Sequence, residues 1–137
     1  MKILVIIIFT FFLISCEKNI EPLGGTVYLE LNQEIYTVGE TVEIYLINES
    51  RSSVYTRYPS AWGFSKYSDG KWAALDIALP QMEPIPIEHK PYKKIISRRT
   101  FQDTGLYMYQ EVFYWDPKFK DEVGMLISNE FEIKIGP

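Results

Sequence analysis

The sequence of 137 residues offers few side chains for covalent or metal chemistry, because it contains one histidine and one cysteine. His89 is the only side chain with an ordinary pKa near neutrality, and Glu88 beside it could orient the imidazole ring. No serine or cysteine nucleophile can be paired with His89 by motif, and no Gly-x-Ser-x-Gly, His-Glu-x-x-His or phosphate-binding glycine loop is present. We therefore interpret His89 as a solvated side chain in an exposed loop and expect no enzymatic activity.

Three carboxylates form a second candidate site, because Asp116, Asp121 and Glu122 lie close together and calcium prefers several oxygen ligands. Their spacing does not match an EF-hand loop, and Lys118 and Lys120 lie among them. This pattern favours a solvated charged loop. We expect neither a metal nor another cofactor.

Charge argues against a nucleic-acid partner, because a net charge of -4 leaves no basic surface that could follow a phosphate backbone. The only basic cluster is formed by Lys93-Lys94 and Arg98-Arg99. Neighbouring residues of a strand point to opposite faces. This cluster is therefore interpreted as a sheet edge or surface rather than as a phosphate site.

Aromatic residues exceed the needs of a core of this size, with ten tyrosines and three tryptophans. Tyr58 and Trp62 lie near one strand end, Tyr114 and Trp115 lie near another, and the two pairs could gather into one binding cluster. Exposed Tyr and Trp favour protein recognition, and their rings can also stack on sugars. The alternative is that most of them form cross-strand pairs. For residues 106–115 the pattern does not decide which face of the strand is buried, because both alternating sets of side chains contain apolar and polar residues.

The N-terminus has the pattern of a secretory signal peptide. Lys2 precedes an apolar run, residues 3–14, in which only Thr10 is polar. The run is shorter than the roughly 20 residues that span a bilayer, and it fits the hydrophobic region of a signal peptide. It leads into Leu13-Ile14-Ser15-Cys16, which resembles the lipobox of bacterial lipoproteins.

The lipoprotein resemblance implies that Cys16 receives a diacylglyceryl group and becomes the mature N-terminus. Residues 1–15 are then the signal peptide, and residues 16–25, with Pro22 and Gly24-Gly25, are a lipidated tether. Two or three acyl chains would hold the protein firmly on a membrane of the bacterial cell envelope, at the outer membrane or cell surface, with the leaflet left open. The alternative is an ordinary cleaved secretory peptide whose cleavage site lies beside a cysteine.

Period-two patterns dominate residues 26–137 and predict one all-β domain. Residues 26–31 and 42–46 predict two half-buried antiparallel strands, and Asp69-Gly70 predicts a hairpin because both central residues of that turn need positive φ. Helix content should be small, because no stretch combines helical apolar spacing with capping signals. The remaining predicted strands, which bring the total to seven or eight, are residues 54–58, 93–101, 106–115 and 130–135.

Four prolines, Pro80, Pro84, Pro86 and Pro91, follow the return strand of the hairpin. Each removes a backbone donor and fixes φ, so this segment is predicted to be a stiff surface connection rather than a strand inside a sheet. If the protein inhibits a protease, this segment is the candidate inhibitory loop.

A sandwich of two antiparallel sheets is the economical closure for this many short strands. Asp103-Thr104-Gly105-Leu106-Tyr107 resembles the tyrosine corner of immunoglobulin-like domains, which implies that the Tyr107 hydroxyl bonds to the backbone just upstream. Tyr109 stands where antibody domains have their second cysteine. We therefore expect an immunoglobulin-like sandwich without a disulfide, held by packing alone.

A wider resemblance rests on turns and strand edges, including Val38-Gly39-Glu40, Asp69-Gly70-Lys71-Trp72 and Ser128-Asn129-Glu130-Phe131. Over residues 26–135 the chain is similar to bacterial Ig-like modules and, distantly, to the BsuPI-type proteinase inhibitors. That resemblance implies a binding domain, with protease inhibition as its specific version. The predicted role is non-catalytic binding of an envelope protein. The alternatives are carbohydrate binding and a structural accessory role in an envelope complex.

Overall fold

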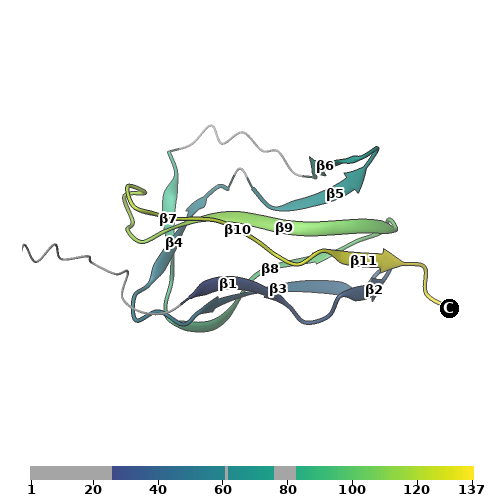
Figure 1. Cartoon of the computed structure of the whole chain (residues 1–137), viewed down its shortest axis with the longest axis horizontal. Coiled ribbons are helices and arrows are strands. Elements are labelled where there is room, and N and C mark those ends of the chain that lie inside the picture. The colour runs from purple at the N-terminus through teal and green to yellow at the C-terminus, as the bar shows by residue number, and fades with distance from the viewer. Residues whose placement is uncertain (1–25, 61, 76–82) are drawn as a thin grey trace, which may run out of the picture.

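The computed structural model describes residues 26–60, 62–75 and 83–137, which form strands in two layers and no helix (Figure 1). None of the described residues belongs to a helix long and apolar enough to cross a membrane. The strands are β1 (Val27–Leu31), β2 (Ile35–Thr37), β3 (Thr41–Asn48), β4 (Val54–Tyr58), β5 (Phe64–Ser68), β6 (Lys71–Ala74), β7 (Ile85–His89), β8 (Tyr92–Thr100), β9 (Gly105–Tyr114), β10 (Glu122–Ile127) and β11 (Phe131–Lys134).

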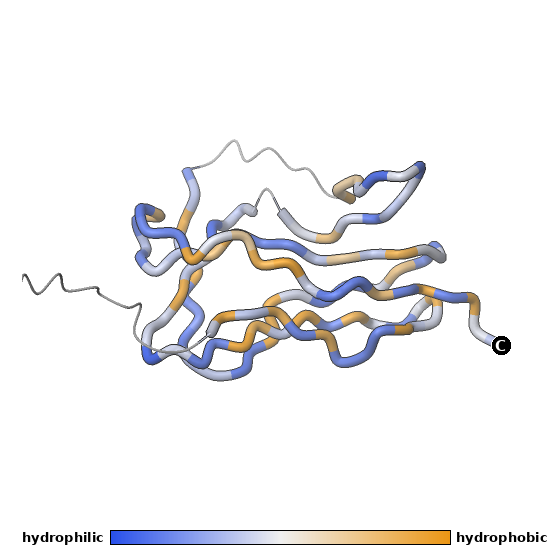
Figure 2. Tube along the Cα trace, viewed as in Figure 1, coloured by the Kyte–Doolittle hydropathy of each residue, from blue (hydrophilic) through white to orange (hydrophobic). Residues whose placement is uncertain are grey.

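The first layer is a sheet of three antiparallel strands in the order β1-β3-β8. Inward and outward residues alternate along β3, where Val42, Ile44 and Leu46 are fully buried. Figure 2 shows the same alternation of hydrophobic and hydrophilic residues along the strands. The period-two pattern of the sequence therefore places one face of this sheet in the core, as expected.

The second layer is organised around β9, which is long enough to pair with two strands along each edge. Tyr107, near its start, pairs with Phe131 of β11 and with Lys66 of β5. Tyr114, at its end, pairs with Glu122 of β10 and with Tyr55 of β4. Strand β2 adds to β11 in parallel, and β7 adds to β4 at the other end of the sheet. The chain is an all-β, immunoglobulin-like sandwich, which confirms the predicted fold class.

An aromatic cluster fills the core between the layers. Phe131 is its centre, with ring centroids 5.6 Å from Tyr36, 6.2 Å from Phe64, 5.7 Å from Phe101 and 5.8 Å from Tyr107. Three of these four contacts are edge-on, the arrangement that aromatic quadrupoles favour. The sandwich is closed by these side chains without a disulfide, since the single cysteine has no second thiol to pair with.

The segment before β9 has the geometry of a tyrosine corner. The Tyr107 hydroxyl donates a hydrogen bond to the backbone carbonyl of Asp103 (3.0 Å), which is the bond that the sequence predicts. Gly105 has a φ of +146°, a backbone conformation that residues with a side chain rarely adopt. The corner therefore needs a residue without a side chain between Asp103 and Tyr107.

Replacing Tyr107 by Phe should lower the free energy of unfolding by about 1 kcal/mol, because the ring stays packed and the hydrogen bond to Asp103 is lost. Urea denaturation followed by tryptophan fluorescence measures the change. Tyr92→Phe, at a side chain that is 84% exposed, is the matched control and should have no effect. Equal stabilities of the two variants would show that the corner hydrogen bond contributes nothing.

Three strands, β2, β7 and β10, are absent from the pattern-based prediction. The largest correction concerns β7, because Pro86 lies inside a strand that pairs with β4 over five residues, from Ile85 to His89. Proline is tolerated here because β7 is an edge strand, which needs no donor towards a further neighbour. Strand β10 carries Gly124, with a φ of +117°, at a register shift that breaks its alternation.

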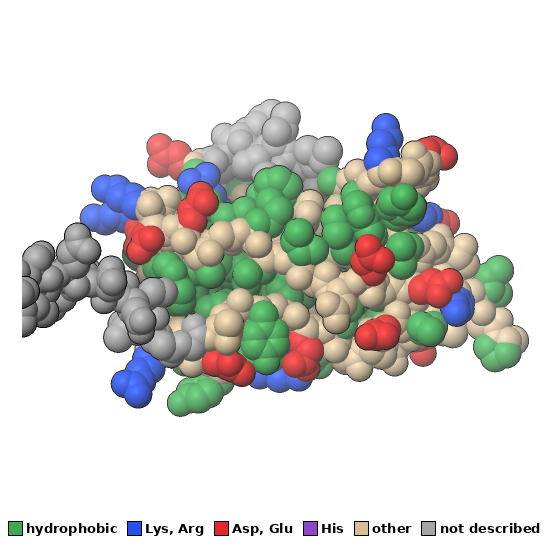
Figure 3. Space-filling model, viewed as in Figure 1, with side chains coloured by type: hydrophobic (Ala, Val, Ile, Leu, Met, Phe, Trp, Pro, Cys, Tyr) green, Lys and Arg blue, Asp and Glu red, His purple; other side chains and the backbone are tan. Residues whose placement is uncertain are grey.

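On the surface, hydrophobic side chains gather over the middle of the face that carries β1 and β10 (Figure 3). Tyr28, Met125 and Ile127 are among the exposed hydrophobic residues of these two strands. The hairpin predicted at Asp69-Gly70 is present, with both residues at positive φ between β5 and β6. The predicted basic edge is also present, because Lys93, Lys94, Arg98 and Arg99 lie on β8, an edge strand of the first sheet.

Candidate functional site

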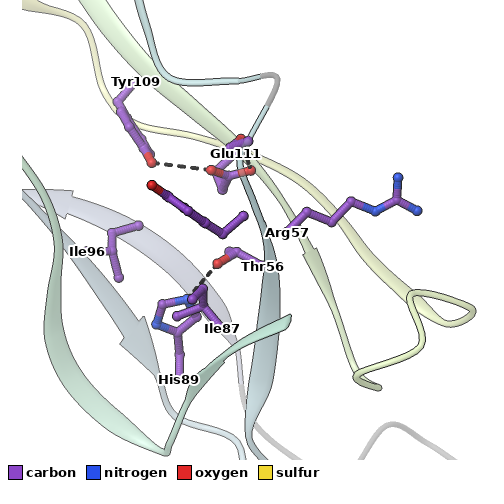
Figure 4. A pocket seen from close by; sticks show the side chains of 9 residues that line it. Thr56, Arg57, Ile87, His89, Ile96, Tyr109 and Glu111 are labelled. Carbon is purple, nitrogen blue, oxygen red and sulfur yellow. Dashed lines mark hydrogen bonds between the residues drawn. The ribbon is translucent and has the colours of Figure 1, made fainter. Parts of the chain in front are cut away.

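A cleft opens along the side of the sandwich where the edge strands β7 and β8 belong to different sheets. Its main cavity has a volume of about 350 Å³, and its walls come from β4, β7, β8 and β9. A hollow of about 480 Å³ continues from it along β8 and shares Ser60, Tyr109 and Glu111 with it. The residues that line the main cavity are Thr56, Arg57, Tyr58, Ser60, Ile87, His89, Ile96, Tyr109 and Glu111 (Figure 4).

Glu111 reaches the cleft because it occupies an inward position of β9. The buried residues of this strand alternate as Tyr107, Tyr109, Glu111 and Phe113, so a carboxylate stands in a row of aromatic side chains. It lies between the stretch of β9 that pairs with β5 and the end that pairs with β4. The connection between β4 and β5 passes this point and brings Ser60 against the carboxylate.

The Glu111 carboxylate is buried and incompletely bonded. Its Oε1 accepts hydrogen bonds from the Ser60 hydroxyl (2.8 Å) and from the Val112 amide (3.0 Å). The only partner of its Oε2 among the described residues is the Tyr109 hydroxyl, at 3.5 Å, which is the outer limit of a hydrogen bond. Burial, which leaves Glu111 6% exposed, raises the pKa of the carboxyl above its ordinary value, and these donors oppose that effect.

Replacing Glu111 by Gln should raise the free energy of unfolding by about 1 kcal/mol at pH 7, because the variant no longer buries an ionised carboxylate. The folded-state pKa lies above the ordinary 4.5, so the ionisation penalty develops as the pH rises above 4.5. The advantage of Glu111→Gln should therefore disappear below pH 4.5. Urea denaturation at pH 7 and pH 4 measures both effects, with Glu88→Gln as the exposed control. A Glu111→Gln protein less stable than the wild type at pH 7 would contradict this account.

His89 is a buried neutral side chain, which corrects its interpretation as a solvated loop residue. It ends β7, is 5% exposed and packs edge-on against Phe113. Its Nε2 shares a hydrogen bond of 2.9 Å with the Thr56 hydroxyl, and its buried Nδ1 has no partner among the described residues. Burial, with a smaller effect of the Lys94 charge, lowers the pKa of His89 to about 4. The imidazole is therefore uncharged at pH 7.

Two polar pairs thus face one cavity (Figure 4). Tyr109 and Glu111 lie at one end, Thr56 and His89 lie at the other, and the side chain of Ile96 lies between the two ends. Concave sites with apolar walls and a few converging polar groups are typical of ligand binding. Within the described parts of the chain, the Thr56–His89 pair has no acceptor of the kind that orients the imidazole of a catalytic triad, and a histidine with a pKa near 4 is a weak base at pH 7.

Two of the four candidate aromatic residues line this cleft, and a third lines a separate small hollow beside it. Tyr58, 59% exposed, lines the main cavity, and Trp62, 42% exposed, lines the neighbouring hollow. Tyr114 is buried, yet it lines a small hollow that also includes Trp62 and Glu111. Trp115 is partly buried against the core and lines none of these hollows.

The loop after β9, which contains the three candidate carboxylates, is stabilised by hydrogen bonds from its backbone amides to one of them. The Asp116 carboxylate accepts hydrogen bonds from the amides of Lys118 (2.8 Å), Lys120 (2.9 Å) and Asp121 (2.7 Å). Burial acts to raise the pKa of Asp116, but these amides lower it below its ordinary value. Among the described residues, no three His, Cys, Asp or Glu side chains are placed to hold a metal ion. Cys16, the predicted lipidation site, lies outside the described residues.

Sequence reasoning missed Glu111, Ser60 and Thr56. The available signal was a polar residue at an inward position of a strand, since Glu111 interrupts Tyr107, Tyr109 and Phe113. That signal could be read only once the buried face of β9 was known. No family model matches this chain, and no curated protein matches it either.

Proposed function

We propose that the protein is a lipid-anchored binding module of the bacterial cell envelope, and that the cleft between β8 and the second sheet is where it holds a protein partner. The observation that carries the proposal is the cavity itself, in which the Glu111 carboxylate is buried and one of its oxygens has only a long hydrogen bond of 3.5 Å among the described residues. Such groups destabilise a fold unless something compensates them. A bound partner supplies that compensation.

The exposed aromatic residues at the cleft support recognition of a protein. Tyr58 and Trp62 each cover a large area with few rotatable bonds, which is why these residue types dominate binding hot spots. The lipobox-like Leu13-Ile14-Ser15-Cys16 supports the anchor, with residues 16–25 as the tether. The role that we propose is non-catalytic, which rests on the absence of catalytic motifs from the sequence.

Protease inhibition and carbohydrate binding, the two more specific functions considered above, differ in the observations that support them. The candidate inhibitory loop is in part a strand, because residues 85–89 pair with β4, and residues 80–82 lie outside the described residues. Protease inhibition therefore stays a prediction from resemblance. Carbohydrate binding is the alternative with structural support, because Trp62 lines a hollow that it shares with the polar side chains of Ser60 and Glu111.

A capture experiment tests the proposal. The acylated protein and its Cys16→Ser form are used as baits on solubilised envelopes, beside Trp62→Ala in each form. A partner retained by Cys16→Ser and lost with Trp62→Ala is the expected result. Tyr92→Ala is the matched control, because Tyr92 is 84% exposed and does not line the cleft.

A partner that binds equally to Trp62→Ala would contradict the cleft as the site. Failure of every bait to retain a protein would overturn the protein-binding version and favour carbohydrate binding. A glycan array then decides that alternative, with Trp62→Ala expected to lose binding and Trp115→Ala, outside the cleft, expected to keep it.

A further inference from the structure

The unused bonding capacity of Glu111 is concentrated on one oxygen. Oε1 is satisfied by Ser60 and Val112, whereas the described part of the chain offers Oε2 only the long contact of 3.5 Å with the Tyr109 hydroxyl. The cavity beside it is large enough for a side chain or a small ligand group. A ligand that donates a hydrogen bond to Oε2 would satisfy the remaining hydrogen-bonding capacity of the Glu111 carboxylate.

Besides burial, the described groups that shift the pKa of Glu111 are the hydrogen-bond donors Ser60, Val112 and Tyr109, and none of them is a cation. Arg57 is one of the residues that line the cavity, but its side chain extends away from the cavity (Figure 4). Its guanidinium lies 4.8 Å from the centroid of the Phe119 ring. On β8, the guanidinium of Arg98 pairs with the Glu43 carboxylate at 2.7 Å. Arg99 lies over the rings of two core phenylalanines.

The walls of the cavity suit the rest of a long cationic side chain. Ile87 and Ile96 offer aliphatic surface, against which the methylenes of lysine or arginine pack favourably. Tyr58 and Tyr109 line the same cavity, and Trp62 lines the adjoining hollow. Aromatic faces attract ammonium and guanidinium groups, most strongly where water is excluded.

We propose that Glu111 is the anchor for a cationic side chain, a guanidinium or ammonium group that the protein partner inserts into the cleft. This inference rests on the proposed function and names the chemistry that the site recognises. A carboxylate that is buried without a counter-ion costs stability, and a cation is the group that compensates it most fully. A neutral sugar hydroxyl could donate a hydrogen bond to Oε2, but it would leave the negative charge of the Glu111 carboxylate without a counter-ion. Arginine is also among the residues most enriched at binding hot spots.

The test uses capped single amino acids as probes of the Cys16→Ser protein. N-acetylarginine methylamide is compared with N-acetylcitrulline methylamide, which has the same shape but no charge, by NMR titration of the Trp62 indole signal and of the Glu111 carboxyl carbon. The arginine probe should bind at least about tenfold more tightly than the citrulline probe. Its binding should also lower the pKa of Glu111.

Two variants isolate the carboxylate. Glu111→Gln should weaken binding of the arginine probe at least about tenfold while it keeps the fold. Glu88→Gln removes the same charge from β7, at an exposed residue whose carboxylate accepts a hydrogen bond from Ser53 (2.7 Å), and should bind the probe as the wild type does. Denaturation curves of both variants separate loss of binding from loss of folding.

Equal binding of the arginine and citrulline probes, unchanged binding by Glu111→Gln, or no shift at the highest soluble probe concentration would each overturn the inference. Shifts of the same signals by chitotriose in place of the arginine probe would overturn it in favour of a sugar site. The capture experiment is read separately, because a partner that depends on Trp62 but not on Glu111 would leave the proposed function standing without the cationic anchor.

Discussion

Replacing Phe131 by Ala should cost about 3 to 5 kcal/mol of the free energy of unfolding, the largest effect expected of a single substitution in this chain. Its ring is 1% exposed and contacts four other aromatic rings, from β2, β5, β9 and the segment before β9. Truncation removes all of these contacts and leaves a cavity between the two layers. Small domains are stable by only about 5 to 15 kcal/mol, so the variant should be close to unfolding.

Urea denaturation of Phe131→Ala and Phe131→Leu measures this effect, with the leucine variant expected to retain part of the packing. Ile135→Ala is the control, because Ile135 follows the same strand and is 81% exposed. A loss below about 1 kcal/mol for Phe131→Ala would mean that the aromatic cluster does not hold the layers together.

Acid should destabilise the protein through His89 by about 3 kcal/mol, because its folded-state pKa is about 4 and its ordinary value is 6.5. The sign follows from proton binding. As the pH falls below 6.5, His89 becomes protonated in the unfolded chain but stays neutral in the folded protein, so stability is lost between pH 6.5 and pH 4. Glu111 acts in the opposite direction, since its raised folded-state pKa makes the folded protein bind a proton first.

A difference measurement separates these contributions. The free energy of unfolding of His89→Gln, minus that of the wild type, should increase by about 3 kcal/mol from pH 7 to pH 4, because all other titratable side chains contribute equally to both proteins. Chemical denaturation at several pH values gives this curve, and NMR titration of the imidazole gives the pKa itself. Parallel stability curves for the two proteins would show that His89 titrates as an exposed histidine.

Much of the fold could be predicted from the sequence because alternation and turn residues act locally. The inward residues of β3 and the Asp69-Gly70 hairpin depend on neighbours a few positions away. The corner hydrogen bond from Tyr107 to Asp103 spans four residues and is equally local. In each case the physical cause lies within the segment that carries the pattern.

The cleft could not be predicted in this way, because it depends on which strands end beside each other. His89 is buried only because β7 pairs with β4 and lies against Phe113, and proline in that segment argued against any strand. Glu111 faces the cavity because the partner of β9 changes from β5 to β4 near it. Ser60 reaches Glu111 from a connection that carries no chemical motif.

The two edge strands that border the cleft also bear on how copies of the protein, anchored as we propose, would behave at high density on a membrane. A strand edge with free amides can template the addition of another chain, and lateral confinement on a membrane favours such polymerisation. Pro86 has no N–H to offer along β7, and β8 carries four long cationic side chains, a feature that discourages the addition of a further strand. These edges should keep neighbouring molecules separate at high surface density and leave the mouth of the cleft free.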